Sequence, residues 1–162
     1  MNTTDLFVKI ALGSWQSQIN ETNKLLEKLT DEDLTKEVSP SRNRGIYLLG
    51  HLASIHDMML PLLRFEDLAF PELKPIFVEA PDRTVEAIPP AKTLREIWNQ
   101  VNEKLAGHFE KLSGDEWLAR HNSISEADFV NQPQRNRLSV LLSRTSHLSY
   151  HRGQMALLEK KK

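Results

Sequence analysis

Apolar side chains recur at steps of three and four residues in four stretches of this 162-residue chain. That spacing places them on one face of an α-helix, which turns by about 100° per residue. The stretches span residues 4–29, 43–64, 93–112 and 136–159. A chain of this length has room for one hydrophobic core of ordinary size. We therefore predict an all-α fold in a single domain, residues 1–162, built as a four-helix bundle of the up-down-down-up type.

The expected helix boundaries rest on capping residues and on proline. Thr4 or Asp5 is predicted to cap the first helix. Pro61 should kink or end the second helix nearby, because proline lacks the amide donor. Thr93, followed three residues later by Glu96, has the pattern of a capping box at the start of the third helix.

Residues 66–90 have no sustained helical period and contain five prolines. We predict a long crossover loop between the second and third helices, apolar enough to pack against the bundle. A helical turn is expected over residues 115–118, followed by a polar connection in which Ile124, Phe129 and Val130 form a short extended piece or an anchor. The terminal lysines, residues 160–162, suit the C-terminus of a helix.

The composition excludes several classes of function. A formal net charge of −1 gives no basis for binding nucleic acid or an anionic membrane. No apolar run approaches the roughly 18 residues of a membrane span, and the first residues lack the pattern of a signal peptide. The absence of cysteine removes disulfides, thiolate nucleophiles and cysteine-based zinc sites. We therefore expect a cytoplasmic protein in which any metal is held by histidines or carboxylates.

Two of the six histidines, His147 and His151, stand four residues apart in the last helix. They lie at the edge of its apolar stripe, which consists of Leu141, Leu148 and Met155. Both imidazoles therefore project from one face, about one turn apart, and can reach one divalent ion. Histidines at this spacing also occur as caps or surface residues, so the pair alone leaves both interpretations open.

A third ligand would have to come from another helix. His51 lies on an almost wholly apolar face of the second helix, and we expect it to be the best-buried histidine. It is either the third ligand or a core residue. His56 lies about 140° further around the same helix, which predicts a structural or surface role. His108 and His121 have no supporting motif.

Two stretches resemble the DinB-like, or YfiT-like, metalloenzyme superfamily of bacterial four-helix bundles. They are residues 50–53, Gly-His-Leu-Ala, and the run from His147 to Gln154, which is similar to the H-x-x-x-H-R-G-Q ending of that family. The resemblance implies one divalent metal, Zn, Ni, Fe or Mn, held by His51, His147 and His151. It also implies a homodimer formed through helix faces.

The better-understood branches of that family transfer low-molecular-weight thiols such as bacillithiol or mycothiol, or isomerise maleylpyruvate with a thiol cofactor. The resemblance thus implies a metal that activates a thiol or water for transfer or hydrolysis of a small-molecule substrate. Residues 41–46 depart from the tryptophan-containing approach to the second-helix histidine seen in many thiol transferases. The alternatives are a non-catalytic dimeric bundle that binds metal or a small ligand, and a fold that keeps its histidines as core residues.

Four more side chains are candidates to support the site or to contact substrate. Tyr150 and Gln154 neighbour His151 in the last helix, and their other interpretations are a core tyrosine and a solvated glutamine. Arg44 and Arg144 lie near the predicted metal-facing sides of their helices and could receive an anionic substrate, although either is equally ordinary as a surface residue. The sequence assigns no general base.

Overall fold

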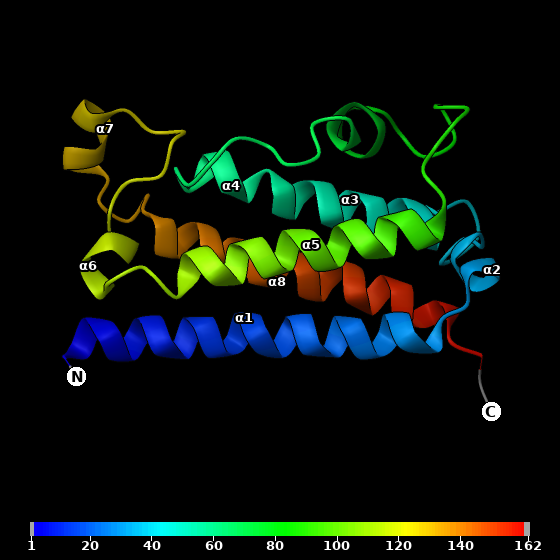
Figure 1. Ribbon diagram of the computed structural model, residues 1–162, viewed down its shortest axis with the longest axis horizontal. Coiled ribbons are helices and arrows are strands. Elements are labelled where there is room, and N and C mark those ends of the chain that lie inside the picture. The colour runs from blue at the N-terminus through cyan, green and yellow to red at the C-terminus, as the bar shows by residue number, and fades with distance from the viewer. Residues whose placement is uncertain (1, 161–162) are drawn as a thin grey trace.

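The computed structural model describes residues 2–160, which form an all-helical fold without strands. Four long helical segments lie side by side along the long axis of the molecule (Figure 1). They are α1 (Thr3–Lys28), α3 (Gly45–Asp57) followed by α4 (Met59–Leu62), α5 (Ala91–Phe109) and α8 (Arg137–Met155). In Figure 1, α1 and α8 run in one direction, whereas α3 and α5 run in the opposite one. The all-α prediction is confirmed.

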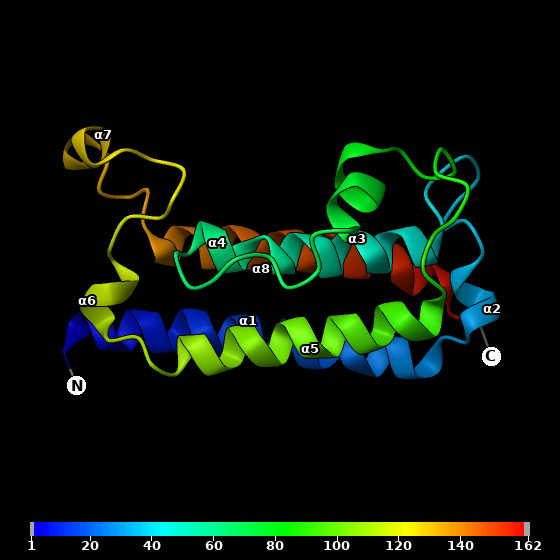
Figure 2. The same cartoon turned by 45° about the horizontal axis from the view of Figure 1, so that its top comes forward.

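Shorter elements connect or end these helices. They are α2 (Asp31–Leu34), the π-helical turn η1 (Pro75–Glu79), α6 (Gly114–Trp117), α7 (Glu126–Asn131) and the 3₁₀ turn η2 (Ala156–Leu158). Figure 2 shows α1 with α5 on one side of the molecule and α3 with α8 on the other. The helical turn predicted over residues 115–118 is confirmed as α6, and α8 with η2 ends close to the predicted boundary.

The predicted apolar stripes form the hydrophobic core. On α1, Trp15 and Ile19 are buried, and so is Thr22, the polar member of the stripe. The Thr22 hydroxyl donates a hydrogen bond to the Gln18 carbonyl, which satisfies it inside the core. Trp98 of α5 is also buried, and its indole N–H donates to a side-chain oxygen of α1. The helices therefore meet through the faces that the periodicity predicts.

The cap of α1 differs from the prediction. Asn2 is the N-cap, and its Oδ1 accepts a hydrogen bond of 2.8 Å from the Asp5 amide. The Asp5 carboxylate accepts one of 3.3 Å from the Asn2 amide in return. The prediction of Thr4 or Asp5 as the cap is wrong, because Asp5 is the third helical residue of a capping box that starts earlier.

The start of α5 also differs from the prediction. Pro90 is the N-cap of α5, and no side chain caps the helix there. Thr93 already lies in the first turn, so the predicted capping box of Thr93 and Glu96 is wrong. The fixed φ angle of proline suits entry into a helix, and it starts α5 one turn earlier than the polar pattern indicates.

The second long helix breaks before its proline rather than at it. α3 ends at Asp57, Met58 interrupts it, and α4 contains Pro61. The ring of a proline clashes with the carbonyl four residues earlier, and Asp57 is that residue. The interruption therefore falls one turn ahead of Pro61.

The crossover segment, residues 66–90, is tied down along its length. The buried Asp57 carboxylate accepts hydrogen bonds from the amides of Ala69 (2.9 Å) and Phe70 (3.0 Å). The segment was predicted to contain no further helix, but η1 forms within it and packs against α3. Phe77 of η1 is fully buried, which explains why this short turn is ordered.

The connection before α8 contains a short helix, so the extended piece, one of its two predicted forms, is wrong. Phe129 and Val130 lie in α7, and Val130 is 79% exposed, so it anchors nothing. Ile124 is the one of the three predicted residues that is buried, as an anchor requires. The three terminal lysines were predicted to suit the C-terminus of a helix. Two of them, Lys161 and Lys162, lie outside the described residues.

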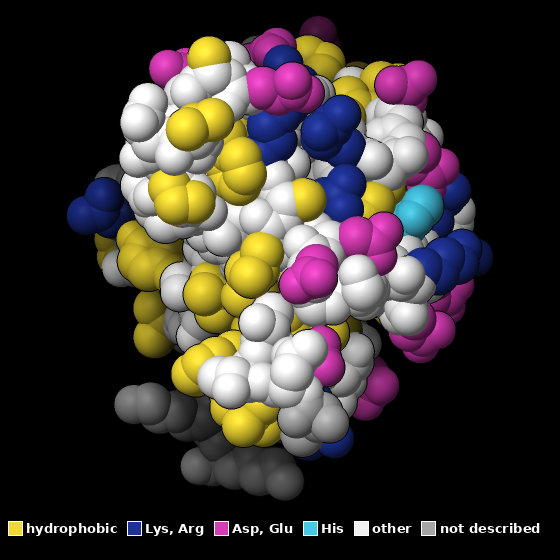
Figure 3. Space-filling model, turned by 90° about the vertical axis from the view of Figure 1, so that its left-hand side faces the viewer, with side chains coloured by type: hydrophobic (Ala, Val, Ile, Leu, Met, Phe, Trp, Pro, Cys, Tyr) yellow, Lys and Arg dark blue, Asp and Glu magenta, His cyan; other side chains and the backbone are white. Residues whose placement is uncertain are grey.

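Hydrophobic side chains, several of them exposed, form a groove between α1 and α8, close to α6. This apolar groove has a volume of about 540 Å³, and its hydrophobic walls consist of Phe7, Ile10, Ala11, Leu118, Leu138 and Leu142. Figure 3 shows hydrophobic side chains on one side of this end of the molecule, while Lys and Arg gather beside Asp and Glu elsewhere on it. Among residues 2–160, no helix has the length and apolar character that crossing a bilayer requires.

Candidate metal centre

Three histidines from two helices converge between α3 and α8. His51 Nε2 lies 3.2 Å from His147 Nε2, and His151 Nε2 lies 3.1 Å from that same nitrogen. The ring centroids are 4.5 to 5.1 Å apart, and all three side chains are partly exposed. The structure thus brings together the three predicted ligand residues, and we call them the histidine cluster.

The hydrogen bonds at the outer ring nitrogens determine which tautomers are present. His51 Nδ1 lies 2.8 Å from the Phe77 carbonyl, which can only accept, so this Nδ1 carries the proton. His151 Nδ1 lies 2.7 Å from Gln154 Oε1, and the same argument applies. Both Nε2 atoms therefore present lone pairs toward His147 Nε2.

Such an arrangement of nitrogens needs a shared positive partner. His147 Nε2 carries at most one proton, so it can satisfy only one of the two lone pairs facing it. A divalent cation would bind the Nε2 atoms of all three histidines at once. Two tetrahedral ligands about 2.0–2.1 Å from an ion lie about 3.3 Å apart, close to the observed separations. The donor set of the histidine cluster therefore fits a divalent metal.

Burial keeps these imidazoles neutral. Burial, together with smaller effects of the neighbouring His151 and His51, lowers the pKa of His147 to about 4. Burial is also the main cause that lowers the pKa of His51 and of His151. At neutral pH the cluster consequently offers unprotonated nitrogens, the form that binds metals.

The Phe77 carbonyl reaches His51 because Gly50 lets η1 approach α3 closely. A Cβ at position 50 would lie 2.6 Å from the Cδ1 and Cζ atoms of the Phe77 ring. Only glycine allows the ring to pack there, and the ring holds the carbonyl of the same residue over His51. Carbonyls that accept the second N–H of a ligating histidine orient the ring and raise its basicity.

The end of the crossover segment is pinned over the start of α3. Tyr47, one turn before His51, stacks parallel to its ring at 6.4 Å and donates a hydrogen bond of 2.7 Å to the Ala80 carbonyl. Asp82 accepts from the Arg44 amide at 2.8 Å and from its guanidinium at 2.7 Å. Arg44 was a candidate for receiving an anionic substrate. Its guanidinium is instead bound by Asp82 and is not free for that role.

Replacing Asp82 with asparagine is expected to lower the free energy of unfolding by about 2 kcal/mol, because a 3%-exposed carboxylate loses its charge-assisted bonds. Burial alone would raise the pKa of Asp82, but the hydrogen bonds from Arg44 outweigh it and lower that pKa. The stabilisation is therefore present above the ordinary carboxyl pKa near 4 and is lost as the pH falls below it. Urea unfolding between pH 3 and pH 7 measures this. Asp67→Asn, an exposed site in the same segment, serves as the control; equal effects would contradict the pinning.

The remaining candidates take three different positions. Gln154 holds His151, as described, and its amide N–H₂ donates to the Tyr150 hydroxyl at 3.3 Å. The Tyr150 ring meets His151 edge-on at 5.0 Å but is 63% exposed, so it is not a core tyrosine. Arg144 lies one turn before His147, and its Nε is buried without a hydrogen-bond partner among residues 2–160. Burial lowers the Arg144 pKa, and its charge lowers the pKa of His51 and His147, so it lies within electrostatic reach of the cluster.

The ranking of the histidines by burial was predicted wrongly. His56 is fully buried, whereas His51 is partly exposed. His56 and His51 lie on different faces of α3. The face that carries His56 packs against Trp15 of α1 and Trp98 of α5, which bury its ring. His108 bonds Glu66 at 3.1 Å and lies outside the histidine cluster, as does His121.

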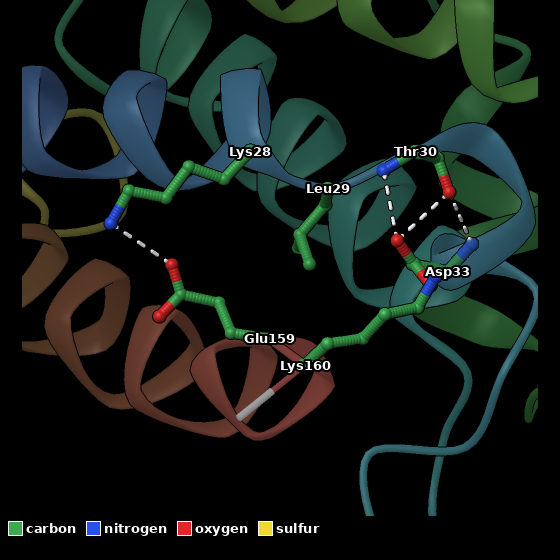
Figure 4. Close-up of a pocket in the computed structure, with 6 residues that line it drawn as sticks. All are labelled: Lys28, Leu29, Thr30, Asp33, Glu159 and Lys160. Atoms are coloured by element: carbon green, nitrogen blue, oxygen red, sulfur yellow. Dashed lines mark hydrogen bonds and ion pairs between the residues drawn. The ribbon is translucent and has the colours of Figure 1, made fainter. Parts of the chain in front are cut away.

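Another hollow, of about 530 Å³, lies at the C-terminal end of α8. Its lining residues are Lys28, Leu29, Thr30, Asp33, Glu159 and Lys160 (Figure 4). Lys28 pairs with Glu159 at 3.0 Å, and Lys160 lies 3.7 Å from Asp33. These ion pairs tie Glu159 and Lys160 to α1 and α2, and no member of the histidine cluster takes part.

These features define a class of protein, an all-helical chain in which three histidines from two helices converge. Residues 14–155 match the DinB superfamily, and the chain belongs to that superfamily. It is 27% identical over 157 residues to the uncharacterized protein YrdA of Bacillus subtilis (strain 168), covering 96% of this chain and 81% of YrdA. A crystal structure of a conserved protein from Enterococcus faecalis has a similar fold, with a TM-score of 0.64, 15% identity and 98% of both chains covered.

Sequence reasoning missed three contributors to the site. The Phe77 carbonyl, the Tyr47 hydroxyl and the Asp82 carboxylate all take part in holding the crossover segment beside His51. Gly50 was a usable signal for the Phe77 contact, since a glycine inside a helix beside a candidate ligand indicates close approach of another segment. The contributions of Tyr47 and Asp82 come from contacts that helical periodicity does not encode.

Proposed function

We propose that this protein is a metal-dependent enzyme in which His51, His147 and His151 hold one divalent cation that activates a thiol or water for small-molecule transfer or hydrolysis. The observation that carries the proposal is the convergence of the three histidine Nε2 atoms. Hydrogen bonds at Nδ1 hold His51 and His151 in the tautomer that leaves Nε2 unprotonated. Three protein ligands leave coordination positions open, as in catalytic sites. We also interpret the four long segments as an up-down-down-up four-helix bundle, supported by their directions in Figure 1.

The residues around the histidine cluster have different proposed roles. Phe77 and Gln154 keep the rings of His51 and His151 oriented with their lone pairs inward. Arg144 has no carboxylate partner among residues 2–160, and we assign it to bind an anionic group of the substrate. Tyr150 offers an exposed aromatic edge beside His151. When bound, a cation there would lower the pKa of a coordinated water or thiol and so supply a nucleophile at neutral pH.

The ligand type narrows the choice of metal. The candidate cofactor is Zn, Ni, Fe or Mn, and imidazole ligands favour the first three of these over Mn. A low-molecular-weight thiol is the proposed co-substrate. The metal-loaded protein should transfer bacillithiol or another small thiol to an electrophilic acceptor, measured by loss of free thiol. Arg144→Gln should raise KM for an anionic acceptor more than it lowers kcat. A loaded protein without turnover of thiol or hydrolysable substrates would favour the alternative, a non-catalytic metal- or ligand-binding bundle.

We further propose that the protein is a homodimer and that the apolar groove forms its interface. Phe7 and Ile10 are 61% and 60% exposed on neighbouring turns of α1, a pattern typical of surfaces covered by another protein. Ile10→Lys should shift the mass in sedimentation velocity from dimer to monomer, because a charge at the centre of an apolar interface is costly to bury. Val130→Lys, at a 79%-exposed site on α7, should leave the mass unchanged. A monomeric parent protein would refute the interface.

Cytoplasmic location stays a prediction from composition.

A further inference from the structure

His121 and Ser123 form a hydrogen-bonded pair outside the histidine cluster, in the connection between α6 and α7. His121 is 7% exposed, and its Nδ1 accepts a hydrogen bond of 3.2 Å from the Ser123 amide. A backbone amide can only donate, so Nδ1 is unprotonated and the neutral ring carries its proton on Nε2. The Ser123 hydroxyl lies 3.0 Å from the same Nδ1 and must therefore donate to it. A serine hydroxyl thus directs its proton at an unprotonated imidazole nitrogen.

This arrangement is the one that activates a serine as a nucleophile. The histidine takes the hydroxyl proton while the serine oxygen attacks a carbonyl carbon, and it must be neutral beforehand to do so. Burial is the main cause that lowers the pKa of His121, and the charges of Arg135 and Arg120 lower it as well, so the ring is neutral at pH 7. Ser123 itself is exposed, so a substrate can reach its Oγ.

The backbone on both sides of Ser123 is fixed. The Asn122 amide donates a hydrogen bond of 2.8 Å to the carbonyl of Leu62, the last residue of α4, which this connection passes in Figure 1. Ile124 is buried, and its carbonyl accepts from the Arg120 guanidinium at 2.9 Å. The hydroxyl and the imidazole are therefore held in place before a substrate binds, as a catalytic pair requires.

A hollow of about 290 Å³ adjoins the serine. Met58, Pro61, Leu62 and Leu68 give it an apolar wall, and Asn122 and Ser123 line it as well. An apolar hollow of this size suits a short acyl chain. The Asn122 side-chain amide offers a donor to the oxyanion that develops on a carbonyl attacked by Ser123.

We propose that Ser123 and His121 form a second reactive site, which hydrolyses carboxylic esters with short acyl chains and acts independently of the metal centre. Ser123 Oγ forms a bond to the ester carbonyl carbon while its proton passes to His121 Nδ1. The bond from that carbon to the leaving oxygen breaks, and this oxygen takes the proton from His121 and departs as an alcohol. Water then attacks the acyl-serine, its proton passes through His121 back to Ser123 Oγ, and a carboxylic acid is released.

The test measures hydrolysis of p-nitrophenyl acetate and p-nitrophenyl butyrate, with and without EDTA. The parent should release p-nitrophenolate equally in both conditions, and peptide mass spectrometry should find an acetyl group on Ser123. Ser123→Ala should lose this label and lower the rate at least about tenfold, as should His121→Phe, which keeps a ring at the buried position. Ser17→Ala, at an exposed serine of α1, is the matched control and should keep the rate within about twofold.

A variant in the wall of the hollow provides a second measurement should His121→Phe not fold. Leu68→Ser should raise KM for the butyrate ester more than for the acetate ester, because it removes apolar surface from the acyl-binding wall. A folded Ser123→Ala with the rate of the parent, or acetyl groups on lysines alone, would overturn the proposal. A rate that EDTA abolishes would overturn it too, because ester hydrolysis would then belong to the metal centre.

Discussion

Replacing His147 with alanine is expected to abolish binding of a divalent metal. His147 Nε2 lies within 3.2 Å of both other Nε2 atoms, so it is the central member of the histidine cluster. Without it two imidazoles from different helices remain, and two ligands rarely hold a divalent ion against water. Elemental analysis of untagged protein, purified without chelator, should find about one metal per parent chain and essentially none in the variant.

Thermal unfolding provides the second measurement. A metal that binds only the folded state stabilises it by about 4 kcal/mol at a free concentration of 1,000 times Kd. Saturating zinc should therefore raise the Tm of the parent by several degrees and leave that of His147→Ala unchanged. His108→Ala is the matched control, a partly exposed histidine that bonds Glu66 outside the cluster. Parent protein without metal, even after incubation with Zn, Ni and Mn, would show that the histidines have only a structural role.

Replacing Gly50 with alanine is expected to weaken both the fold and the metal site. The added methyl group would overlap the buried Phe77 ring, and overpacking of this kind costs about 1–3 kcal/mol. Relief of the overlap requires η1 to move away from α3, which takes the Phe77 carbonyl away from His51 Nδ1. Loss of such an outer hydrogen bond typically weakens metal binding about 10- to 100-fold. Urea unfolding and zinc titration measure the two effects.

Two other helical glycines provide the control for Gly50→Ala. A Cβ added to Gly13 of α1 or to Gly107 of α5 would meet no neighbouring heavy atom of residues 2–160 within 4 Å, so alanine has open space there. Alanine at either site should stabilise the protein by about 0.5–1 kcal/mol, because glycine loses more backbone entropy in a helix. A Gly50→Ala variant as stable as these, with unchanged zinc affinity, would contradict the close packing of η1 on α3.

The sequence was enough to name the histidine residues that converge and to name Gln154 as a candidate support for them, but not the Phe77 carbonyl. His147 and His151 share one helix, so a four-residue step is enough to predict that they lie together. His51 comes from another helix, and its pairing with them depended on the resemblance to a family. Arg44 looked available because its sequence position says nothing about Asp82, 38 residues away, which binds it.

The sequence by itself determined the helical faces of this protein, because the period of apolar residues follows from the geometry of one helix. It therefore predicted the all-α fold, the buried stripe of α1 and the shared face of His147 and His151. Only the tertiary structure decided what each face meets. It placed His56 between two tryptophans, set the Phe77 carbonyl on His51 through Gly50, and bound Arg44 to Asp82. Such contacts join residues far apart in the chain, and a backbone carbonyl has no side chain to mark it, so no local pattern could record them.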